Sequence, residues 1–485
     1  TEKCEELKIA SRHSMHAAAR HARRCLGSTT SSADVVVIGS GIIGSSTALE
    51  LARSGKYKRV VVLDKGYTAG GGSTSSSSGV CRPFYSVEDA VRFAHEGFHI
   101  WENWEDHLGV KADSRGHARL RTIGGIVLIS DTSEDFVNRT AACMKAVGVE
   151  HEFLDSAETH ARYGEDGLGW SLEAYAPPRL LGDPLFGSVS ETDSIRGALW
   201  VPECGYVSDP QLAAQNLQRA AELSGAEFIF GAEIVDFLRS PDNARITGVR
   251  LADGETIEAP IVVNVAGPDS SHVTSLAFSG EGTPPNDMKV ATRPLRVEVS
   301  IVPAPPGVDY EADGPMVADF DVGTYWRPEV GNKILIGSVE PICDEPHPFV
   351  ELPQRASEVN LSLTDQWTVQ VHRTCLRIPE MPIPGSSNVQ GLVACYDAAD
   401  DWTPIYDQSA IGGYYMAIGT SGNQFKNAGV AGQLMAAIVG ECEEGRAHDV
   451  DPVQLEMKRT GTGSMNSAIF SRLRSSHSTS GTVMG

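Results

Sequence analysis

The chain of 485 residues is 41% hydrophobic and 21% charged, which is typical of a folded protein with two or three domains and a large core. Its formal charge of −23 at pH 7 argues against a nucleic-acid partner and against binding to an anionic membrane surface. The nine cysteines include no C-x-x-C pair and no grouping with histidines, which argues against a disulfide framework or a zinc site.

These features favour a reducing compartment, and we expect a cytoplasmic protein that holds no metal. No apolar run has the length of a membrane span, and residues 1–32 lack the apolar segment of a secretory signal. A transit peptide is an alternative for this stretch, but Glu2, Glu5 and Glu6 argue against it. We expect an N-terminal extension that packs on the surface.

A strand–turn–helix–strand pattern follows the extension. Val35–Ile38 is a short β-branched run, as in a buried parallel strand, and it leads into a G-x-G-x-x-G formed by Gly39, Gly41 and Gly44. Apolar residues then recur at helical spacing, and a second apolar run ends in Asp64. The pattern predicts a dinucleotide-binding unit rather than a glycine-rich turn without a ligand.

Each element of this unit has a physical role. Gly39 allows the tight turn, Gly41 lets backbone approach a pyrophosphate, and Gly44 lets the helix pack close to the strand. The helix N-terminus offers N–H groups and a partial positive charge to the phosphates. Asp64 can accept hydrogen bonds from a ribose hydroxyl, and its charge argues against NADP.

The remaining chain alternates between two kinds of structure. A Gly/Ser-rich stretch, residues 65–79, is predicted to be a loop that approaches the ligand, and a helical pattern covers Val87–Leu108. The next predicted elements are a strand at Gly125–Ile129, a helix at Ser133–Val147 and a helix capped by Asp209 with Pro210 at its first position.

The second half of the chain is predicted to contain strands at Glu227–Phe230 and Glu233–Leu238, a hairpin around Asp253-Gly254 and a buried strand at Ile261–Ala266. An antiparallel sheet within residues 290–380, a strand at Tyr414–Ile418 and a helix at Gly429–Val439 follow. The polar tail is expected to wrap the surface or to be partly disordered.

Together these motifs resemble the FAD-dependent amino-acid oxidase (DAO) family, nearest to its sarcosine oxidase, dimethylglycine dehydrogenase and glycine oxidase branch. The resemblance covers about residues 33–440. Its specific pieces are the Gly39–Asp64 unit, Tyr206–Pro210, Val262–Pro268 and Gly419–Lys426. It implies an α/β fold in which a Rossmann-like FAD-binding domain of the glutathione-reductase type carries an inserted α+β substrate domain built on a large antiparallel sheet.

The resemblance also implies how the two domains share the chain. The FAD-binding domain is expected to comprise residues 33–115, 201–288 and 391–440. The substrate domain is expected to comprise residues 116–200 and 289–390, inserted between those segments. Residues 1–32 form the N-terminal extension, and residues 441–485 form the C-terminal tail.

The cofactor and its contacts follow from the same resemblance. We expect FAD to contact Gly39, Gly41, Ile42, Ile43, Gly44, Asp64, Lys65, Ser73, Thr74, Ile234, Ala266, Gly267, Gly419, Thr420, Gly422, Asn423, Gln424 and Lys426. The cysteine that carries FAD covalently in sarcosine oxidase falls at Ala394, one place before Cys395, so we expect non-covalent FAD.

Three residues, one of them the Lys426 named above, match the branch's substrate site. Arg82 precedes the aromatic pair Phe84-Tyr85 and would bind a substrate carboxylate bidentately; the alternative is a surface ion pair. Lys426 would add a charge to that site or contact the flavin. Tyr396 matches an active-site tyrosine, or is a core tyrosine with a satisfied hydroxyl.

A lysine that activates oxygen in this branch falls at Leu335. Lys333 lies on the same strand face two residues away and is the candidate substitute. Asp397, Asp400 and Asp401 form an acidic cluster that we interpret as a solvated loop. The helical histidines 95, 99 and 107 are interpreted as surface residues rather than metal ligands.

The family reaction oxidises the C–N bond of a small, N-methylated or secondary amino acid by hydride transfer to flavin, and the imine is then hydrolysed. The electron acceptor is oxygen or a separate electron carrier. Two alternatives stay open: oxidation of a 2-hydroxy acid, or a non-catalytic flavin-binding subunit of a larger complex.

Overall fold

The computed structural model describes residues 31–344 and 355–485. All but the last two residues of the predicted N-terminal extension lie outside the described residues. Within the described residues, no helix has the length and apolar character needed to cross a lipid bilayer.

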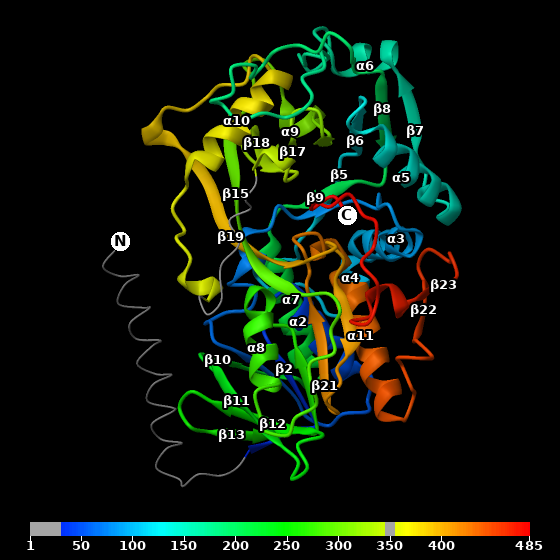
Figure 1. Cartoon of the computed structure of the whole chain (residues 1–485), viewed down its shortest axis with the longest axis vertical. Coiled ribbons are helices and arrows are strands. Elements are labelled where there is room, and N and C mark those ends of the chain that lie inside the picture. Colours follow the sequence, from blue (N-terminus) through cyan, green and yellow to red (C-terminus); the bar gives the residue numbers. More distant parts are fainter. Residues whose placement is uncertain (1–30, 345–354) are drawn as a thin grey trace.

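A six-stranded sheet forms the core of the lower half of the molecule (Figure 1). Five neighbouring strands run parallel, and β20 pairs antiparallel at one edge. The strand order is β10 (Glu227–Phe230), β3 (Val60–Asp64), β2 (Val35–Ile38), β14 (Ile261–Asn264), β21 (Tyr414–Ile418) and β20 (Ile405–Gln408). Segments far apart in the sequence therefore lie side by side.

Both faces of this sheet are buried. Alternate residues of β2 pack into two different cores, one on each face. One core contains α2 (Ile42–Arg53), α7 (Pro210–Leu223) and α11 (Ala428–Glu443). The other contains α8 (Ser270–Ala277) and a four-stranded sheet in the order β1 (Ser31–Ser32), β13 (Thr256–Glu258), β12 (Ile246–Leu251) and β11 (Ile234–Arg239). Burial on both faces explains why these strands read as continuous apolar runs.

An eight-stranded sheet forms the upper half (Figure 1). Its order is β19 (Gln390–Ala399), β15 (Thr292–Pro303), β18 (Lys333–Ser338), β17 (Thr324–Glu329), β16 (Met316–Asp319), β6 (Gly125–Ile129), β8 (Gly197–Val201) and β7 (Glu152–Asp155). The pairs are antiparallel, as the sequence pattern predicts, except that β16 and β6 run parallel. This pair joins two segments that are far apart in the chain, so no hairpin constrains their direction.

A small sheet lies between the halves, in the order β4 (Val80–Cys81), β9 (Gly205–Val207) and β5 (Leu120–Thr122). The other α-helices of the described residues are α3 (Glu88–Glu102), α4 (Trp104–Leu108), α5 (Glu134–Val147), α6 (Ser156–Tyr163), α9 (Tyr310–Asp313) and α10 (Asp365–Arg377). Short 3₁₀ segments are η1 (Ser73–Ser76), η2 (Gly267–Asp269), η3 (Ile342–Asp344), η4 (Ala356–Glu358), η5 (Ser386–Asn388), η6 (Phe425–Asn427) and η7 (Ser467–Phe470), and β22 (Gln454–Glu456) pairs with β23 (Ser464–Asn466).

Local signals in the sequence predicted several elements correctly. The strand–turn–helix–strand unit is β2, α2 and β3, and the Asp253-Gly254 hairpin is β12–β13. Asp209 caps α7 by accepting a hydrogen bond from the Leu212 amide at 2.8 Å, with Pro210 at the first helical position. These signals act over a few residues and need no knowledge of the rest of the fold.

Two expectations differ from the structure. The helix predicted over residues 87–108 is broken at Asn103, whose side-chain amide donates to the His99 carbonyl at 2.9 Å and so competes with the helical pattern. The predicted boundary at 390/391 falls within β19, which pairs along its length with β15 of the eight-stranded sheet. β19 therefore belongs to the upper sheet, although its end reaches the lower half.

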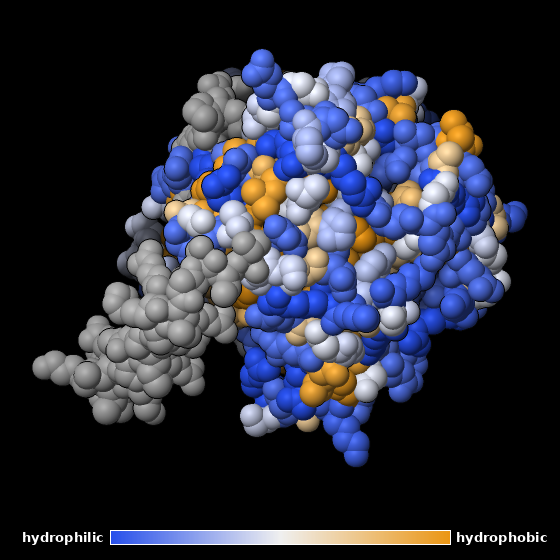
Figure 2. Space-filling view, turned by 90° about the horizontal axis from the view of Figure 1, so that it is seen from below, coloured by the Kyte–Doolittle hydropathy of each residue, from blue (hydrophilic) through white to orange (hydrophobic). Residues whose placement is uncertain are grey.

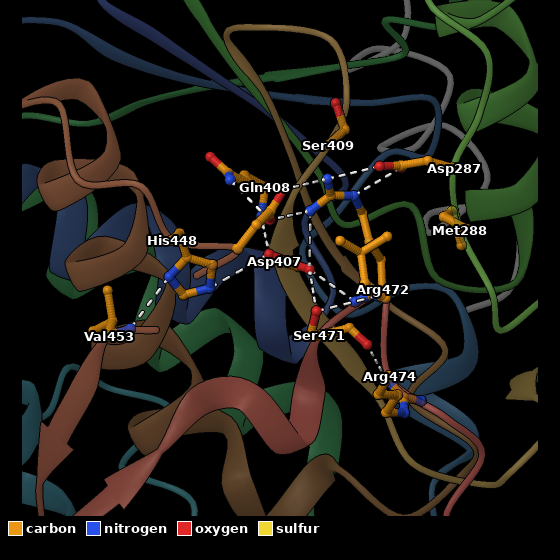
Figure 3. A network of polar contacts seen from close by, with 12 residues as sticks. Asp287, Met288, Asp407, Gln408, Ser409, His448, Val453, Ser471, Arg472 and Arg474 are labelled. Atoms are coloured by element: carbon orange, nitrogen blue, oxygen red, sulfur yellow. Dashed lines mark hydrogen bonds and ion pairs between the residues drawn. The ribbon is translucent and has the colours of Figure 1, made fainter. Parts of the chain in front are cut away.

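The polar tail after residue 440 is packed against the protein rather than disordered. Arg472 is 2% exposed, and its guanidinium donates to Asp287 at 2.8 Å (Figure 3). It also donates to Asp449 at 2.7 and 2.9 Å. Its backbone amide also donates to the fully buried Asp407 at 2.7 Å. Arg474 pairs bidentately with Asp401 at 2.8 and 2.9 Å. Buried ion pairs of this kind fix the path of a tail that hydrophobic periodicity does not predict.

The surface seen from below is mostly hydrophilic, and hydrophobic residues appear there in small separate groups (Figure 2). The acidic excess of the chain is consistent with such a surface.

We expect Arg472→Met to destabilise the fold by about 3–5 kcal/mol, because it leaves the buried Asp407 carboxylate without its cation. Chemical denaturation followed by tryptophan fluorescence measures the change. Arg446→Met is the matched control, since Arg446 pairs with Glu441 and Asp451 at the surface and should change the midpoint little. Equal midpoints for the two variants would contradict the structural role of Arg472.

Candidate functional site

A cavity of about 910 Å³, part of it open to solvent, lies where the two halves meet. One side is formed by the first turn of α2 and by η1, and the other by β15 and β19 of the eight-stranded sheet. The predicted cofactor residues that line it are Gly41, Ile42, Ile43, Gly44, Ser73, Thr74, Gly267, Thr420, Gly422 and Gln424, together with Tyr396 from the predicted substrate site.

The glycine-rich turn after β2 is packed too closely for side chains. Gly39 has φ +107°, and a Cβ there would lie 2.3 Å from the Val265 carbonyl oxygen. A Cβ at Gly44 would lie 2.1 Å from the Gly39 carbonyl oxygen. The glycines therefore allow β2, α2 and the end of β14 to meet, as the motif predicts.

The N-terminus of α2 faces the cavity. Its N-cap is Gly41, which has no side chain to bond the first-turn amides, and the Ile42 amide donates to the Thr74 hydroxyl at 3.1 Å. First-turn amides and the helix dipole form a site suited to an anion such as a pyrophosphate. A hydroxyl-rich loop beside it, residues 73–78, supplies further hydrogen-bonding groups.

Asp64 lies beside the same turn at the end of β3. Its Oδ2 accepts hydrogen bonds from the Ser40 amide and hydroxyl, both at 2.7 Å, and its Oδ1 accepts from the Gly66 amide at 2.7 Å. These bonds hold the carboxylate at the carboxyl edge of the sheet, next to the predicted pyrophosphate site. The position fits a ribose contact.

Other predicted cofactor residues do not line this cavity. Lys65 forms an ion pair with Asp269, and Ile234 is buried at the start of β11. Ala266 and Gly419 are in turns whose neighbouring residues line the cavity. Asn423 lines a second cavity and donates to the Trp402 carbonyl at 3.2 Å.

The second cavity, of about 370 Å³, adjoins the first and shares with it Ser77, Ser78, Tyr325, Gly422 and Phe425. Arg82 and Lys426 line it. Within the described residues, no carboxylate lies within ion-pair distance of either side chain. The predicted carboxylate-binding residues therefore come together beside the predicted flavin cavity.

Arg82 is buried, 3% exposed, which excludes the alternative of a surface ion pair. Its Nη1 donates to the Phe84 carbonyl at 2.5 Å and its Nη2 to the Val483 carbonyl at 2.9 Å. The guanidinium carbon lies 4.7 Å from the ring centroids of both Phe84 and Tyr85. These contacts orient the side chain and use two of its five N–H donors.

Lys426 is also buried, and its Nζ donates to the Tyr85 hydroxyl at 2.8 Å and to the Asn423 carbonyl at 2.5 Å. Burial, together with the nearby charge of Arg82, lowers the pKa of Lys426 well below its ordinary value. Two neighbouring buried cations repel one another, so an anion in this cavity would stabilise both.

Tyr396 lies on β19 against Gly422, where a Cβ would meet the tyrosine ring at 2.4–2.6 Å. Tyr396 and Tyr325 both line the first cavity, and burial raises the pKa of both hydroxyls. The two hydroxyls therefore stay neutral near pH 7 and act as hydrogen-bonding groups rather than bases.

The assignment of Lys333 as a catalytic residue is not supported by its position. Its Nζ bonds to Gln390 at 3.0 Å, and it pairs with Pro303, four residues along β15 from the cavity-lining Val299. Four residues of strand span roughly 13 Å. Leu335, between them, is buried among apolar side chains. The basic side chains that line the second cavity are Arg82 and Lys426.

The structure adds residues that sequence patterns did not predict. Asp397 and Asp401 are buried rather than solvated. Asp397 lines the first cavity, and its Oδ1 has no hydrogen-bond partner among the described residues. Val483 and Met484 line the second cavity. The Val483 amide donates a hydrogen bond at 3.0 Å to Glu340, and burial raises the pKa of Glu340 to about 8. These positions come from distant segments and carry no local motif.

Comparison with known proteins agrees with this geometry. The profile of the DAO family, described as "FAD dependent oxidoreductase", matches residues 34–438. The chain is 24% identical over 432 residues to FAD-dependent oxidoreductase domain-containing protein 1 of Bos taurus, covering 84% of this chain and 81% of that protein. It is 27% identical over 317 residues to mitochondrial sarcosine dehydrogenase of Homo sapiens, covering 64% of this chain but only 29% of that protein.

The crystal structure of glycine oxidase from Geobacillus kaustophilus superposes with a TM-score of 0.63 at 20% identity, covering 92% of this chain and all of that one. At this identity the likeness concerns the fold. It confirms the α/β architecture with a nucleotide domain and a second domain on a large sheet. The nucleotide-binding turn, the cavity beside it and the match over residues 34–438 lead to one conclusion: the chain belongs to the DAO family of FAD-dependent oxidoreductases.

Proposed function

We propose that the protein oxidises the C–N bond of a small secondary or N-methylated amino acid. The observation that carries this proposal is the pair of buried cations, Arg82 and Lys426, in a cavity that adjoins the predicted flavin cavity. A substrate carboxylate would supply the anion that these cations lack among the described residues. Human sarcosine dehydrogenase, a relative at 27% identity, is named for an N-methylated amino acid.

The residues present fit FAD as the cofactor. The first turn of α2 would hold the pyrophosphate, and Asp64 a ribose. Ala394, which lines the cavity, has no group to link a flavin, which supports non-covalent binding. When bound, FAD would accept the hydride, and oxygen or a separate electron carrier would then accept the electrons.

The chain's own contribution is to bind and orient the substrate. Arg82 meets the carboxylate bidentately, and Lys426 adds a point charge. The apolar and aromatic walls, Met316, Tyr325 and Phe425, exclude water from the carbon that loses hydride. The amine lone pair forms the C=N bond as hydride leaves the adjacent carbon, and water then hydrolyses the imine to a carbonyl compound and an amine.

The test of the reaction is anaerobic addition of candidate substrates to the flavoprotein, with flavin absorbance as the readout. N-methylated and secondary amino acids are expected to bleach the flavin, and 2-hydroxy acids are not. Bleaching by hydroxy acids alone would establish the alternative dehydrogenase chemistry. No bleaching by any of these compounds would favour a non-catalytic flavin-binding subunit.

We expect Arg82→Ala to raise KM for the amino-acid substrate by about tenfold or more, because a buried charge pair is lost, while flavin content stays unchanged. Steady-state kinetics measures the effect. Arg121→Ala is the control, since Arg121 pairs with Glu311 at the surface. Unchanged KM in Arg82→Ala would remove Arg82 from the substrate site.

A carboxylate without an amine, such as propionate, should bind more weakly as pH rises. Protonated Lys426 favours the anion, so binding is strongest below the pKa of Lys426 and weakens as pH rises through it, and this pKa is lowered by burial. Flavin absorbance changes at several pH values give the affinity. Lys426→Met should bind propionate more weakly at low pH and lose this pH dependence; an unchanged profile would contradict the role.

Acid precipitation should release the flavin into the supernatant, because Ala394 stands where the branch's linking cysteine would be. Absorbance of supernatant and pellet measures the partition. Flavin that stays in the pellet would show a covalent link, and its loss in Cys395→Ser would assign that link to Cys395, which also lines the cavity.

A further inference from the structure

A cluster of ligand-type atoms lies between α3 and the connection from β8 to β9. His95 and His99 are four residues apart and project from one helix face. Glu203, in the connection between β8 and β9, reaches both of them. One ligand atom from each residue lies within 4.8 Å of the others. None of the three lines either cavity.

The side-chain nitrogen and oxygen atoms of His95, His99 and Glu203 lie close to one another. The two Nε2 atoms are 3.1 Å apart. Glu203 Oε2 lies 2.8 Å from His95 Nε2, and Oε1 lies 3.4 Å from His99 Nε2. In a tetrahedral zinc site with Zn–N distances of about 2.05 Å, neighbouring ligand atoms are roughly 3.3 Å apart. The observed separations lie around that value.

A hydrogen on one Nε2 gives a hydrogen bond between the two rings at 3.1 Å, but the buried Glu203 Oε2 has no hydrogen-bond partner among the described residues. Two imidazole nitrogens that face one another at 3.1 Å cannot both carry hydrogen without repulsion. Protonating both rings fully would place two positive charges on rings with centroids 4.7 Å apart. A single divalent cation would instead accept both Nε2 lone pairs and a carboxylate oxygen at once.

A second carboxylate orients one of the ligands. Glu102 Oε2 lies 2.7 Å from His99 Nδ1, so a hydrogen on Nδ1 directs the Nε2 lone pair into the cluster. A carboxylate behind a histidine ligand is the usual outer partner in zinc proteins. The side chains of His99 and Glu203 are each 26% exposed, which leaves an entry path and room for water.

We propose that His95, His99 and Glu203 bind Zn²⁺, with water in the remaining position. Two imidazoles and one carboxylate form a ligand set that zinc uses. The ion would tie α3 to the β8–β9 connection, where the Cys204 carbonyl accepts hydrogen bonds from the Ile123 and Gly124 amides at 3.0 Å. From the sequence, the two histidines are interpreted as surface residues and no metal is predicted, whereas His95 is buried and Glu203, far along the chain, lies beside both.

The test uses the flavoprotein as purified, stripped with a chelator and dialysed against buffered Zn²⁺. The parent should bind about one Zn²⁺ per chain. His99→Gln and Glu203→Gln should each weaken the affinity by about 100-fold or more, and Glu102→Gln by about tenfold or more, since outer-partner losses cost roughly 10–100-fold. His160→Gln is the matched control. The His160 side chain lies on another helix, α6, and among the described residues it hydrogen-bonds only to the Ser156 carbonyl of the same helix.

Added Zn²⁺ should also raise the melting temperature of the parent and of His160→Gln but not that of His99→Gln, as linkage requires. The flavin spectrum reports whether each variant is folded. Absence of stoichiometric binding by the parent at micromolar Zn²⁺, or equal affinity in the parent and His99→Gln, would overturn the proposal. If a variant fails to fold, the parent's stoichiometry still decides it.

Discussion

The structure depends on the buried contact at which the two sheets are joined. Asp397, at the end of β19, accepts hydrogen bonds through Oδ2 from the Gly419 amide at 2.6 Å and the Ser270 hydroxyl at 2.8 Å. Its carbonyl accepts from the Ser421 amide at 2.7 Å. One residue of the upper sheet thus binds two turns at the carboxyl edge of the lower sheet. This contact sets Tyr396 against Gly422, so it also sets the wall shared by the two cavities.

The cavity walls carry basic side chains, whereas the chain as a whole has a negative net charge. The formal charge is −23, yet the walls beside the predicted flavin site carry Arg82 and Lys426. Among the described residues, the neighbouring carboxyl Glu340 is buried, and its raised pKa of about 8 keeps it protonated near neutrality. The positive charge of Arg82 is therefore not cancelled by an ionised Glu340, and an anion that enters the cavity would favour the protonated form of Lys426, whose pKa burial lowers. An acidic surface does not exclude an anionic substrate when the site that receives it is enclosed.

Much of the nucleotide half could be predicted because its signals are local. The Gly39, Gly41 and Gly44 spacing follows from steric contacts within one turn, and the Asp209 cap of α7 depends on a bond across three residues. The catalytic assignment of Lys333 lacks structural support because strand alternation gives a face but not a position along the sheet. The contact of Val483 with Arg82 joins residues 401 positions apart, and no periodicity encodes it.

Helix α3 contacts both Lys426 and Glu203, which are far apart in the sequence. The Trp101 indole donates to the Lys426 carbonyl at 2.8 Å, and a Cβ at Gly97 would lie 2.8 Å from the same oxygen. One side of α3 therefore positions the backbone of Lys426, while His95 and His99 project from it toward Glu203. Since a helix is stiff over a few turns, a shift of α3 relative to the β8–β9 connection would displace Lys426 as well. A contact that fixes α3 at residues 95–99 would thus limit the movement of Lys426 in the wall of the second cavity, although none of its residues lines either cavity.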